Sequence, residues 1–433
     1  MELDPTRMCA LLVGLPDVRV LGVEDGDGPL RIHVEVPVGV MGCAQCGTRA
    51  RVKERPVVEL VDLPCFGRPT RLVWRKHRWS CPDADCPAGS WTGECRRVGP
   101  ARAVMTDRAG RWATLQVGRN GRTVAEVARE LGCDWHTINT AVMAYGTPLV
   151  DDPDRFGSVD ALGLDETLFC RRGRWRSQEW CTSIVDVTRP SQLLDVVAGR
   201  SAAGPTGWLD GRPDEWRVGI RWGVLDLSGP YRKTFNDALP HARQVADPFH
   251  VVKLANHKLD ECRRRVQNET LGHRGRKHDP LYRGRRLLTK GHERLDERGA
   301  EKLMNLLEVG DPRGEVRMAW HAKEVVRSIY DIDDPTIADA FVAQLAGDLQ
   351  DESCPPEIHQ LGRTITRWRA QITNWHRARV SNGPTEAANN LIKRIKRVGF
   401  GFRRFANYRI RVLLYAGRPN WDLLATIDPA EFR

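Results

Sequence analysis

Two closely spaced pairs of cysteines constrain the N-terminal part of this chain more than any other feature of the sequence. The motifs CAQC at 43–46 and CPDADC at 81–86 each follow a stretch that is typical of a β-strand. Four thiolates at two such turns can complete a tetrahedral Zn²⁺ shell and leave no open position for chemistry. The sequence therefore predicts a zinc ribbon with a structural metal. The predicted ligands are Cys43, Cys46, Cys81 and Cys86.

Three alternatives to this site remain open. An iron–sulfur cluster uses the same thiolates, although two knuckles on a ribbon favour zinc. Cys95 lies close enough along the chain to replace Cys86 as a ligand. The four cysteines could also be unrelated core residues, as we expect for the isolated cysteines elsewhere. A disulfide scaffold is excluded, because 12 cysteines in 433 residues are too few for one.

The charge balance favours an anionic partner. There are 67 Lys and Arg against 56 Asp and Glu, a net charge of +11. Most of the basic residues are arginines, whose planar guanidinium suits phosphate recognition. No run of about 18 apolar residues occurs, and the start MELDPTRMCALL lacks a basic and then apolar leader. We therefore expect an intracellular protein that is neither secreted nor embedded in a membrane.

Strand-like and helix-like patterns alternate along the chain and predict a multi-domain α+β protein. Strands are expected on both sides of EDGDGP within 16–40, at 71–80, three times from 159 onward, within 217–228 and at 242–247. Helical spacing occupies 100–147, and the Asp- and Pro-rich stretch 147–158 is typical of a linker.

Residues 255–378 show no strand pattern and predict a helical insertion, where Trp320, Trp368 and Trp375 are expected to pack in the core. The predicted domains are a β-rich zinc-binding domain at 1–100, a helix-turn-helix at 101–150, the first part of an α/β core at 151–255, an α-helical insertion at 256–378 and the C-terminal part of the core at 379–433.

Residues 123–146 match a helix-turn-helix. Thr123 and Glu126 have the spacing of a capping box, Gly132 offers a turn, and Asp134 or Trp135 begins a second helix. A plain helical hairpin is the alternative reading. In a helix-turn-helix, the start of the second helix faces base edges and flanking arginines lie near phosphates. The predicted base-facing residues are Asp134, Trp135, His136 and Asn139, and the phosphate-facing residues are Arg119, Arg122 and Arg129.

Four carboxylates lie at the ends of apolar segments: Asp165, Asp226, Asp247 and Glu386. A carboxylate after a hydrophobic strand is costly to desolvate unless it is paired or metal-bound. Neighbouring strands can bring such groups to one edge of a sheet, where Mg²⁺ uses oxygen ligands to bind substrate phosphates. For any single Asp, a cap or turn is the commoner role. Three strands, a fourth with a second Asp and a late helix with Glu follow a ribonuclease-H-like order.

Three longer blocks make the pattern specific: LGLDETLFCRRG, VLDLSGPYRKTFNDALPHARQVADPFHVVKLAN and SNGPTEAANNLIKRIKRVGFGFRRFANYRIRVLL. They resemble blocks of the ISL3-family transposases of bacterial insertion sequences. Residues 43–95 resemble that family's zinc-binding domain, and 105–146 its helix-turn-helix. The resemblance covers nearly the whole chain in the family's own order, and NGPTE is its most specific part.

The resemblance implies a DDE transposase with a ribonuclease-H-like core and an α-helical insertion. Asp165, Asp226 and Glu386 match the catalytic carboxylates, which hold two Mg²⁺ or Mn²⁺ ions, and Asp247 and His250 match an accessory element. Glu166 adjoins Asp165, but neighbours on a strand point to opposite faces, so we expect Asp165 to be the ligand.

The implied partners are double-stranded DNA, as terminal inverted repeats and as target, and further copies of the chain on paired ends. The implied location is the bacterial cytoplasm at the nucleoid. Basic residues after Glu386 are expected to neutralise DNA phosphates, with a solvated face as the alternative. They are Lys393, Arg394, Lys396 and Arg397. The rival functions are a transposase-derived, non-catalytic DNA-binding regulator and a nuclease that cuts without joining.

Overall fold

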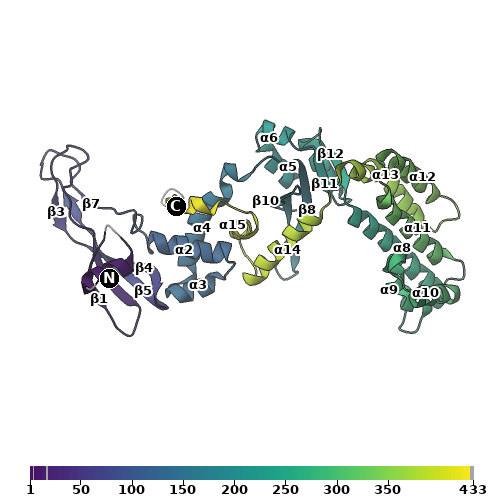
Figure 1. Ribbon diagram of the computed structural model, residues 1–433, viewed down its shortest axis with the longest axis horizontal. Coiled ribbons are helices and arrows are strands. Elements are labelled where there is room, and N and C mark those ends of the chain that lie inside the picture. Colours follow the sequence, from purple (N-terminus) through teal and green to yellow (C-terminus); the bar gives the residue numbers. More distant parts are fainter. Residues whose placement is uncertain (3, 16–17, 430–433) are drawn as a thin grey trace. The chain divides into compact units, whose positions relative to one another are not determined.

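The computed structural model describes residues 1–2, 4–15 and 18–429 (Figure 1). Their internal contacts define two compact units. The first unit is Met1–Arg155 with Asn390–Arg433, and the second unit is Phe156–Asn389. The predicted segment 379–433 is therefore divided between the two units. Both helices and sheets occur, as the sequence patterns predicted.

The N-terminal part of the first unit contains one helix and two small sheets. The elements are α1 (Pro5–Val13), β1 (Arg19–Glu24), β2 (Leu30–Glu35), β3 (Arg51–Glu54), β4 (Val57–Cys65), β5 (Arg68–Arg75), β6 (Arg78–Ser80) and β7 (Ser90–Thr92). The sheet orders are β1-β2-β5-β4 and β3-β6-β7. The predicted strands around EDGDGP are confirmed as the antiparallel pair β1 and β2.

The strand-rich stretch predicted at 71–80 is confirmed, but it contains parts of two strands, because the chain changes sheets within it. β5 ends at Arg75, and β6 begins at Arg78 in the other sheet. Between them the Lys76 N–H donates to the Pro56 carbonyl at 2.9 Å, and His77 is buried with Nε2 3.2 Å from Glu35 Oε1. An apolar alternating pattern cannot distinguish one long strand from two strands that belong to different sheets.

The helical part of the first unit contains the predicted pair of helices. Its elements are α2 (Asp107–Thr114), the π-helix η1 (Leu115–Arg119), α3 (Val124–Leu131), α4 (Trp135–Asp151), α15 (Phe405–Ala416) and η5 (Trp421–Ala425). The capping box of Thr123 and Glu126 is confirmed, Gly132 ends α3 with φ 62°, and the Asp134 side chain caps α4. These caps explain why the chain turns sharply between two short helices.

The linker predicted from residue 147 begins later, because α4 continues to Asp151 with Pro148 inside it. Proline removes one helical hydrogen bond. Here Leu149 and Val150 are almost completely buried, and this burial favours the continued helix. α15 packs closely on the same helix, because a Cβ on Gly146 would lie only 2.8 Å from Leu414 Cδ1.

The second unit contains a five-stranded sheet of order β10-β9-β8-β11-β12. Its elements are β8 (Ala161–Arg172), β9 (Ser177–Asp186), β10 (Gln192–Ala198), α5 (Ala203–Asp210), α6 (Asp214–Val218), β11 (Trp222–Leu225), α7 (Gly229–Ala238) and β12 (Arg243–Ala246). β8, β9 and β10 are antiparallel neighbours, whereas β11 runs parallel to both β8 and β12. The fourth strand is shorter than predicted, since Arg217 and Val218 belong to α6.

A run of helices follows the sheet, drawn in green in Figure 1. They are α8 (Pro248–Leu271), α9 (Pro280–Thr289), α10 (Glu297–Gly310), α11 (Glu315–Ser328), α12 (Pro335–Asp348) and α13 (Pro356–Ala378), and α14 (Gly383–Val398) comes next. The prediction of a strand-free stretch is confirmed. Trp320 and Trp368 are 4% and 5% exposed within the core that also contains the sheet, so their expected packing role is confirmed too.

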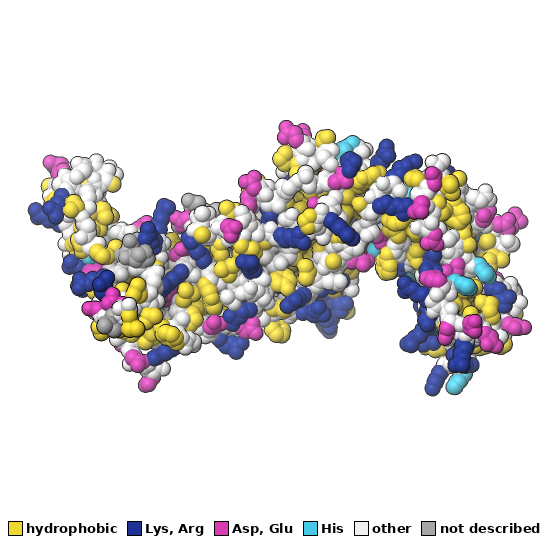
Figure 2. All heavy atoms as spheres, viewed as in Figure 1, with side chains coloured by type: hydrophobic (Ala, Val, Ile, Leu, Met, Phe, Trp, Pro, Cys, Tyr) yellow, Lys and Arg dark blue, Asp and Glu magenta, His cyan; other side chains and the backbone are white. Residues whose placement is uncertain are grey.

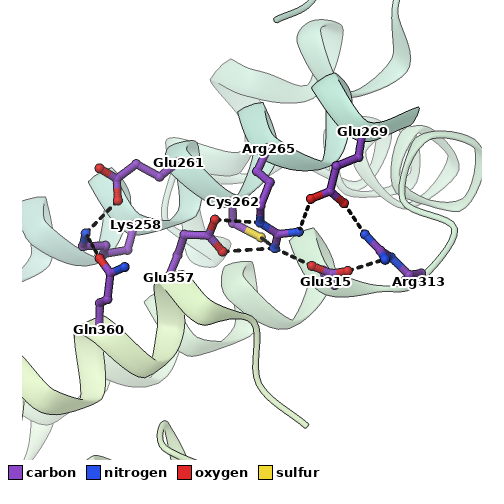
Figure 3. A network of polar contacts seen from close by, with 9 residues as sticks. All are labelled: Lys258, Glu261, Cys262, Arg265, Glu269, Arg313, Glu315, Glu357 and Gln360. Atoms are coloured by element: carbon purple, nitrogen blue, oxygen red, sulfur yellow. Dashed lines mark hydrogen bonds and ion pairs between the residues drawn. The ribbon is translucent and has the colours of Figure 1, made fainter. Parts of the chain in front are cut away.

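A network of charged side chains joins three of these helices (Figure 3). Arg265 on α8 donates from Nε to Glu357 Oε1 on α13 at 2.8 Å and pairs with Glu315 on α11. Its Nη1 also lies 3.1 Å from Glu269 Oε1, one turn along α8. Arg313 pairs with Glu269 and Glu315 from the other side. Because Glu315 and Glu357 lie on two other helices, the network fixes the relative positions of α8, α11 and α13.

Candidate active site and metal centres

Three carboxylates of the second unit meet where β11 ends. Asp165 and Glu166 lie on β8, and Asp226 directly follows β11. An oxygen from each of them lies within 4.8 Å of the others. The pairing of β8 with β11 ends at Gly163 and Val224, so the part of β8 after Gly163 is not paired with β11. Two parallel strands thus bring their acidic residues to one edge of the sheet.

Two details of this site differ from the sequence-based expectation. Asp165 is inside β8 rather than at its end, because β8 continues in a long hairpin with β9 as far as Arg172. Glu166 was expected to point away, yet its carboxylate joins Asp165 and Asp226. Alternation fixes the direction of Cβ, but a long side chain on an unpaired strand edge can turn toward that edge. Asp165 Oδ1 itself turns back to accept the Glu166 N–H at 2.7 Å.

The electrostatics of this cluster favour a bound cation. Burial raises the pKa of Asp226 to about 6, and the neighbouring charges of Glu166 and Asp165 add to the effect. Burial also raises the pKa of Asp165. Asp226 Oδ1 is buried and has no hydrogen-bond partner within the described part of the chain. An orphaned carboxylate oxygen among repelling carboxylates is a donor set that fits a hard divalent metal.

The first turns of α14 pack directly on this site. Asn389 Nδ2 donates to Asp165 Oδ2 at 2.7 Å. β8 and α14 approach so closely that a Cβ on Gly163 would lie 2.4 Å from Thr385 Oγ1 and 2.9 Å from Asn382 Oδ1. Gly163 and Asn389 are not among the predicted site residues, although both stand in the family-like blocks LGLDE and NGPTEAANN.

Glu386, the third predicted catalytic carboxylate, is exposed on α14. It is not part of the carboxylate group that the described residues form. It lies three residues before Asn389, and residues at this spacing share one side of a helix. Glu386 is therefore one turn along α14 from the residue that contacts Asp165.

Asp247 and His250 form a pair in which Asp247 is buried and His250 is half-buried. Asp247 caps α8, and its Oδ2 lies 3.0 Å from His250 Nδ1 while its Oδ1 accepts the Asn382 N–H at 2.8 Å. Burial acts to raise the pKa of Asp247, but the bonds from His250 and Asn382 outweigh it and lower that pKa. The bond to Asp247 raises the pKa of His250. The pair thus joins α8 to the start of α14, and a positive charge on His250 partly opposes the rise in the pKa values of Asp165 and Asp226.

The Asp247–His250 pair makes stability depend on pH. The folded-state pKa of His250 lies above the unfolded value of about 6.5. Its contribution to the free energy of unfolding is therefore complete below about pH 6.5 and is lost as the pH rises through the folded-state value. Between pH 6 and pH 8, the free energy of unfolding should fall more in the wild type than in His250→Gln. It is measured by urea unfolding in EDTA. Equal losses in the two proteins would contradict this assignment.

The four predicted zinc ligands come together in the first unit. The Sγ atoms of Cys43, Cys46, Cys81 and Cys86 lie within 4.8 Å of one another, whereas Cys95 is not in the group formed by the described residues. Cys43 Sγ is 3.7 Å from Cys86 Sγ, and Cys46 Sγ is 3.5 Å from Cys81 Sγ. A tetrahedron with Zn–S bonds of about 2.3 Å has edges of about 3.8 Å, so this spacing fits a four-thiolate metal site.

The thiols of this cluster differ in acidity. Hydrogen bonds from Thr48 lower the pKa of Cys46 to about 6. A backbone bond at Asp83 lowers the pKa of Cys81, but desolvation and the nearby sulfurs outweigh it and raise that pKa to about 12. The thiol of Cys46 therefore loses its proton more readily than the thiol of Cys81. A bound cation would stabilise the thiolate form of both, because cysteines coordinate metals as thiolates.

Three of the four residues predicted to face DNA bases line a cleft of the first unit, whereas Asp134 caps α4 with its side chain. Trp135, His136 and Asn139, all at the start of α4, line it together with residues 398–404. Trp135 is 45% exposed. Two of the three predicted phosphate-contacting arginines bind within the protein here: Arg122 Nη2 lies 2.6 Å from Glu130 Oε2, and Arg129 Nε donates to the Ala125 carbonyl at 3.5 Å.

The basic residues of α14 lie opposite its apolar face. Ile392 and Ile395 are buried, while Lys393, Arg394 and Arg397 are exposed and Lys396 is half-buried. On the face shown in Figure 2, dark blue Lys and Arg side chains gather over the region where Figure 1 draws α14. Within the described residues, none of the helices is long and apolar enough to cross a membrane.

Comparison with known proteins identifies relatives. The transposases for insertion sequence element IS1557 from two Mycobacterium tuberculosis strains, CDC 1551 / Oshkosh and ATCC 25618 / H37Rv, are each 26% identical over 394 residues, which cover 83% of this chain and 82% of the relative. A 63-residue stretch is 41% identical to an ATP-dependent protease of Lactococcus lactis subsp. lactis, but covers only 14% of this chain and 20% of that protein, too little to bear on activity.

A family model also matches, and it contains every residue of the carboxylate site. It describes the transposases of the ISL3 family of DDE transposases and matches residues 162–412, more than half of the 433 residues. The chain therefore belongs to the ISL3 family of DDE transposases.

Proposed function

We propose that this chain is the transposase of an insertion sequence, which binds the terminal inverted repeats and catalyses metal-dependent cleavage and transfer of DNA strands. The observation that carries the proposal is the cluster of Asp165, Glu166 and Asp226, whose half-buried, repelling carboxylates suit a divalent cation. Family membership supplies the substrate class, because transposases act on DNA.

We infer that the sheet of the second unit is a ribonuclease-H-like core. Numbered in chain order, its strands stand 3-2-1-4-5, with three antiparallel strands followed by two parallel ones. The helices from α8 to α13 then form an insertion between β12 and α14. Along the sequence, the second Asp (Asp226) thus comes before the helical insertion and the late Glu (Glu386) comes after it.

Asp165, Asp226 and Glu386 are proposed as the catalytic carboxylates. Two Mg²⁺ or Mn²⁺ ions held there would activate the attacking oxygen and stabilise the leaving oxygen in an in-line displacement at phosphorus. Asn389 holds Asp165 in place through its amide, and the positive charge favoured on His250 partly opposes the rise in the pKa values of Asp165 and Asp226. Glu386 would complete the set by turning inward from the adjacent turn of α14.

The first unit is proposed to read the DNA. The four cysteines would hold a structural Zn²⁺, and α3 and α4 would act as a helix-turn-helix in which Trp135, His136 and Asn139 face bases. The phosphate contacts would come from Arg122, Arg129, Lys393, Arg394, Lys396 and Arg397. We expect at least a dimer on paired ends, because two ends must be held together. A non-catalytic regulator would not need the carboxylate cluster, so that alternative is not favoured.

The proposal is tested by incubating the full chain with labelled DNA that flanks its own gene, in Mg²⁺ and in EDTA. Nicks at the repeat boundary are expected in Mg²⁺ alone. Glu386→Gln should reduce their rate by about 10²-fold or more, because one anionic ligand is lost from the transition state. Glu166→Gln is the matched control, and a larger loss there would make Glu166 the third ligand instead. Binding without metal-dependent nicks would favour a regulator.

A further inference from the structure

A cleft of about 530 Å³ in the first unit lies between the start of α4 and the segment that joins α14 to α15. This volume is in the range of ordinary ligand sites. Three arginines line the cleft, namely Arg403, Arg404 and Arg411, and no acidic residue is among its described lining residues. The charge of the lining therefore suits a polyanion.

One residue that lines the cleft is a buried cation for which the described residues provide no counter-ion. Arg411 is only 4% exposed, and its Nη2 donates to the Arg122 carbonyl at 3.2 Å. Its guanidinium lies 5.6 Å from the centre of the Phe402 ring. Arg411 Nε has no hydrogen-bond partner among the described residues, and burial lowers the pKa of this arginine to about 10. A buried charge that no carboxylate offsets is costly, and an anion in the cleft would offset it.

The rim of the cleft presents an aromatic ring to solvent. Phe400 is 94% exposed, between Gly399 and Gly401 in the turn after α14. Across the cleft stands Trp135, which is 45% exposed. Aromatic rings beside arginines are how proteins hold nucleic acids whose bases are accessible, because every base offers a face for stacking.

We propose that this cleft is a DNA-binding site in which a strand phosphate is held by the charge of Arg411 while the ring of Phe400 stacks on a neighbouring base. The inference rests on the proposed function, since it takes DNA as the ligand. It extends the predicted reading surface of α4 to the segment after α14 and assigns roles to Phe400 and Arg411. Arg404, exposed at the rim, would contribute to the same phosphate contact.

Two substitutions should have different signatures in the full chain. Binding is measured by anisotropy over a series of salt concentrations, on labelled duplexes with single-stranded ends that tile the DNA flanking the gene and on a scrambled duplex of the same form, because a base must be accessible to stack on Phe400. Arg411→Met is expected to lower the slope of log K against log salt by about one, because one phosphate contact is lost. Phe400→Ala should weaken binding by about 5- to 100-fold at every salt concentration and leave the slope unchanged, because stacking releases no counterions.

Matched controls separate these effects from folding. Phe66→Ala removes another aromatic ring, which is 91% exposed. Phe66 and Phe400 both precede a glycine and have similar backbone angles, with φ 49° and φ 51°. It does not line this cleft and should bind as the wild type does. Arg411→Lys keeps the charge and should keep the salt slope. Thermal melts by circular dichroism verify that each variant folds. If Arg411→Met does not fold, Phe400→Ala still tests the inference, because Phe400 lies on the surface.

If Arg411→Met and Phe400→Ala both kept the wild-type affinity and salt slope, the inference would be overturned and the proposed function would remain intact. An equal loss in Phe66→Ala and Phe400→Ala would also overturn it, because the effect would not belong to the cleft. If the wild type bound no flanking duplex better than the scrambled one, the proposed reading of terminal repeats would fail as well.

Discussion

Replacing Asp165 by Asn is expected to abolish strand cleavage and to leave DNA binding within about 2-fold of the wild type. The substitution keeps the size of the side chain but removes one negative charge from the group with Glu166 and Asp226. Losing a ligand that stabilises the transition state costs about 10²–10³-fold or more in rate. The DNA-reading residues proposed above lie in the other compact unit, so binding should persist. Cleavage and binding are measured on the same end-labelled duplexes.

Asp160→Asn is the matched control for this experiment. Asp160 directly precedes β8 and pairs through Oδ2 with Arg221 Nη2 at 3.0 Å, away from the carboxylate cluster. Exposed ion pairs contribute about 1 kcal/mol or less, so this variant should cleave at nearly the wild-type rate. Residual cleavage in Asp165→Asn close to that of the control would remove Asp165 from the site.

Asp226→Asn should give a second signature that does not depend on activity. The raised pKa of Asp226, about 6, means that its charge destabilises the metal-free fold at neutral pH. The asparagine variant should therefore unfold at a higher temperature than the wild type in EDTA and should gain less from added Mn²⁺. A lower melting temperature in EDTA would contradict the repulsion on which the site rests.

Removal of zinc is expected to unfold the three-stranded sheet β3-β6-β7 without melting the second unit. Few side chains of this sheet are buried, with Trp79 the main exception, so little apolar burial holds it together. Structural zinc contributes on the order of 10 kcal/mol to folding in small domains. Cys81→Ser, or treatment with a strong chelator, should release the metal, expose residues 36–56 and 76–99 to limited proteolysis and weaken DNA-end binding by about 10-fold or more.

Cys95→Ser is the control, because Cys95 lies near the motif in sequence but outside the group of four sulfurs. It should retain zinc, measured by mass spectrometry or a colorimetric chelator, and resist the protease. The sheet β1-β2-β5-β4 has its own core, including Leu72 and Trp74, and should survive in both variants. Zinc loss in Cys95→Ser together with retention in Cys81→Ser would contradict the ligand assignment.

Local patterns in the sequence were sufficient for the elements that depend on near neighbours. The capping box of Thr123 and Glu126, the glycine turn at Gly132 and the strand-free stretch after β12 follow from residues within a few positions of one another. The two cysteine motifs also predicted that their four sulfurs lie together, because two such turns can supply the four ligands of one tetrahedral metal site. The family resemblance identified Asp165 and Asp226, which the structure brings together.

Tertiary structure alone decided which side chains surround those residues. Glu166 joins the carboxylates because β11 ends where β8 continues, and the sequence does not encode relative strand ends in any local pattern. Asn389 reaches Asp165 from 224 positions away, and Arg411 meets the Arg122 carbonyl from 289 positions away. Contacts of this separation depend on how whole elements pack. The sequence therefore determined the elements and the family, whereas packing determined the partners of each functional group.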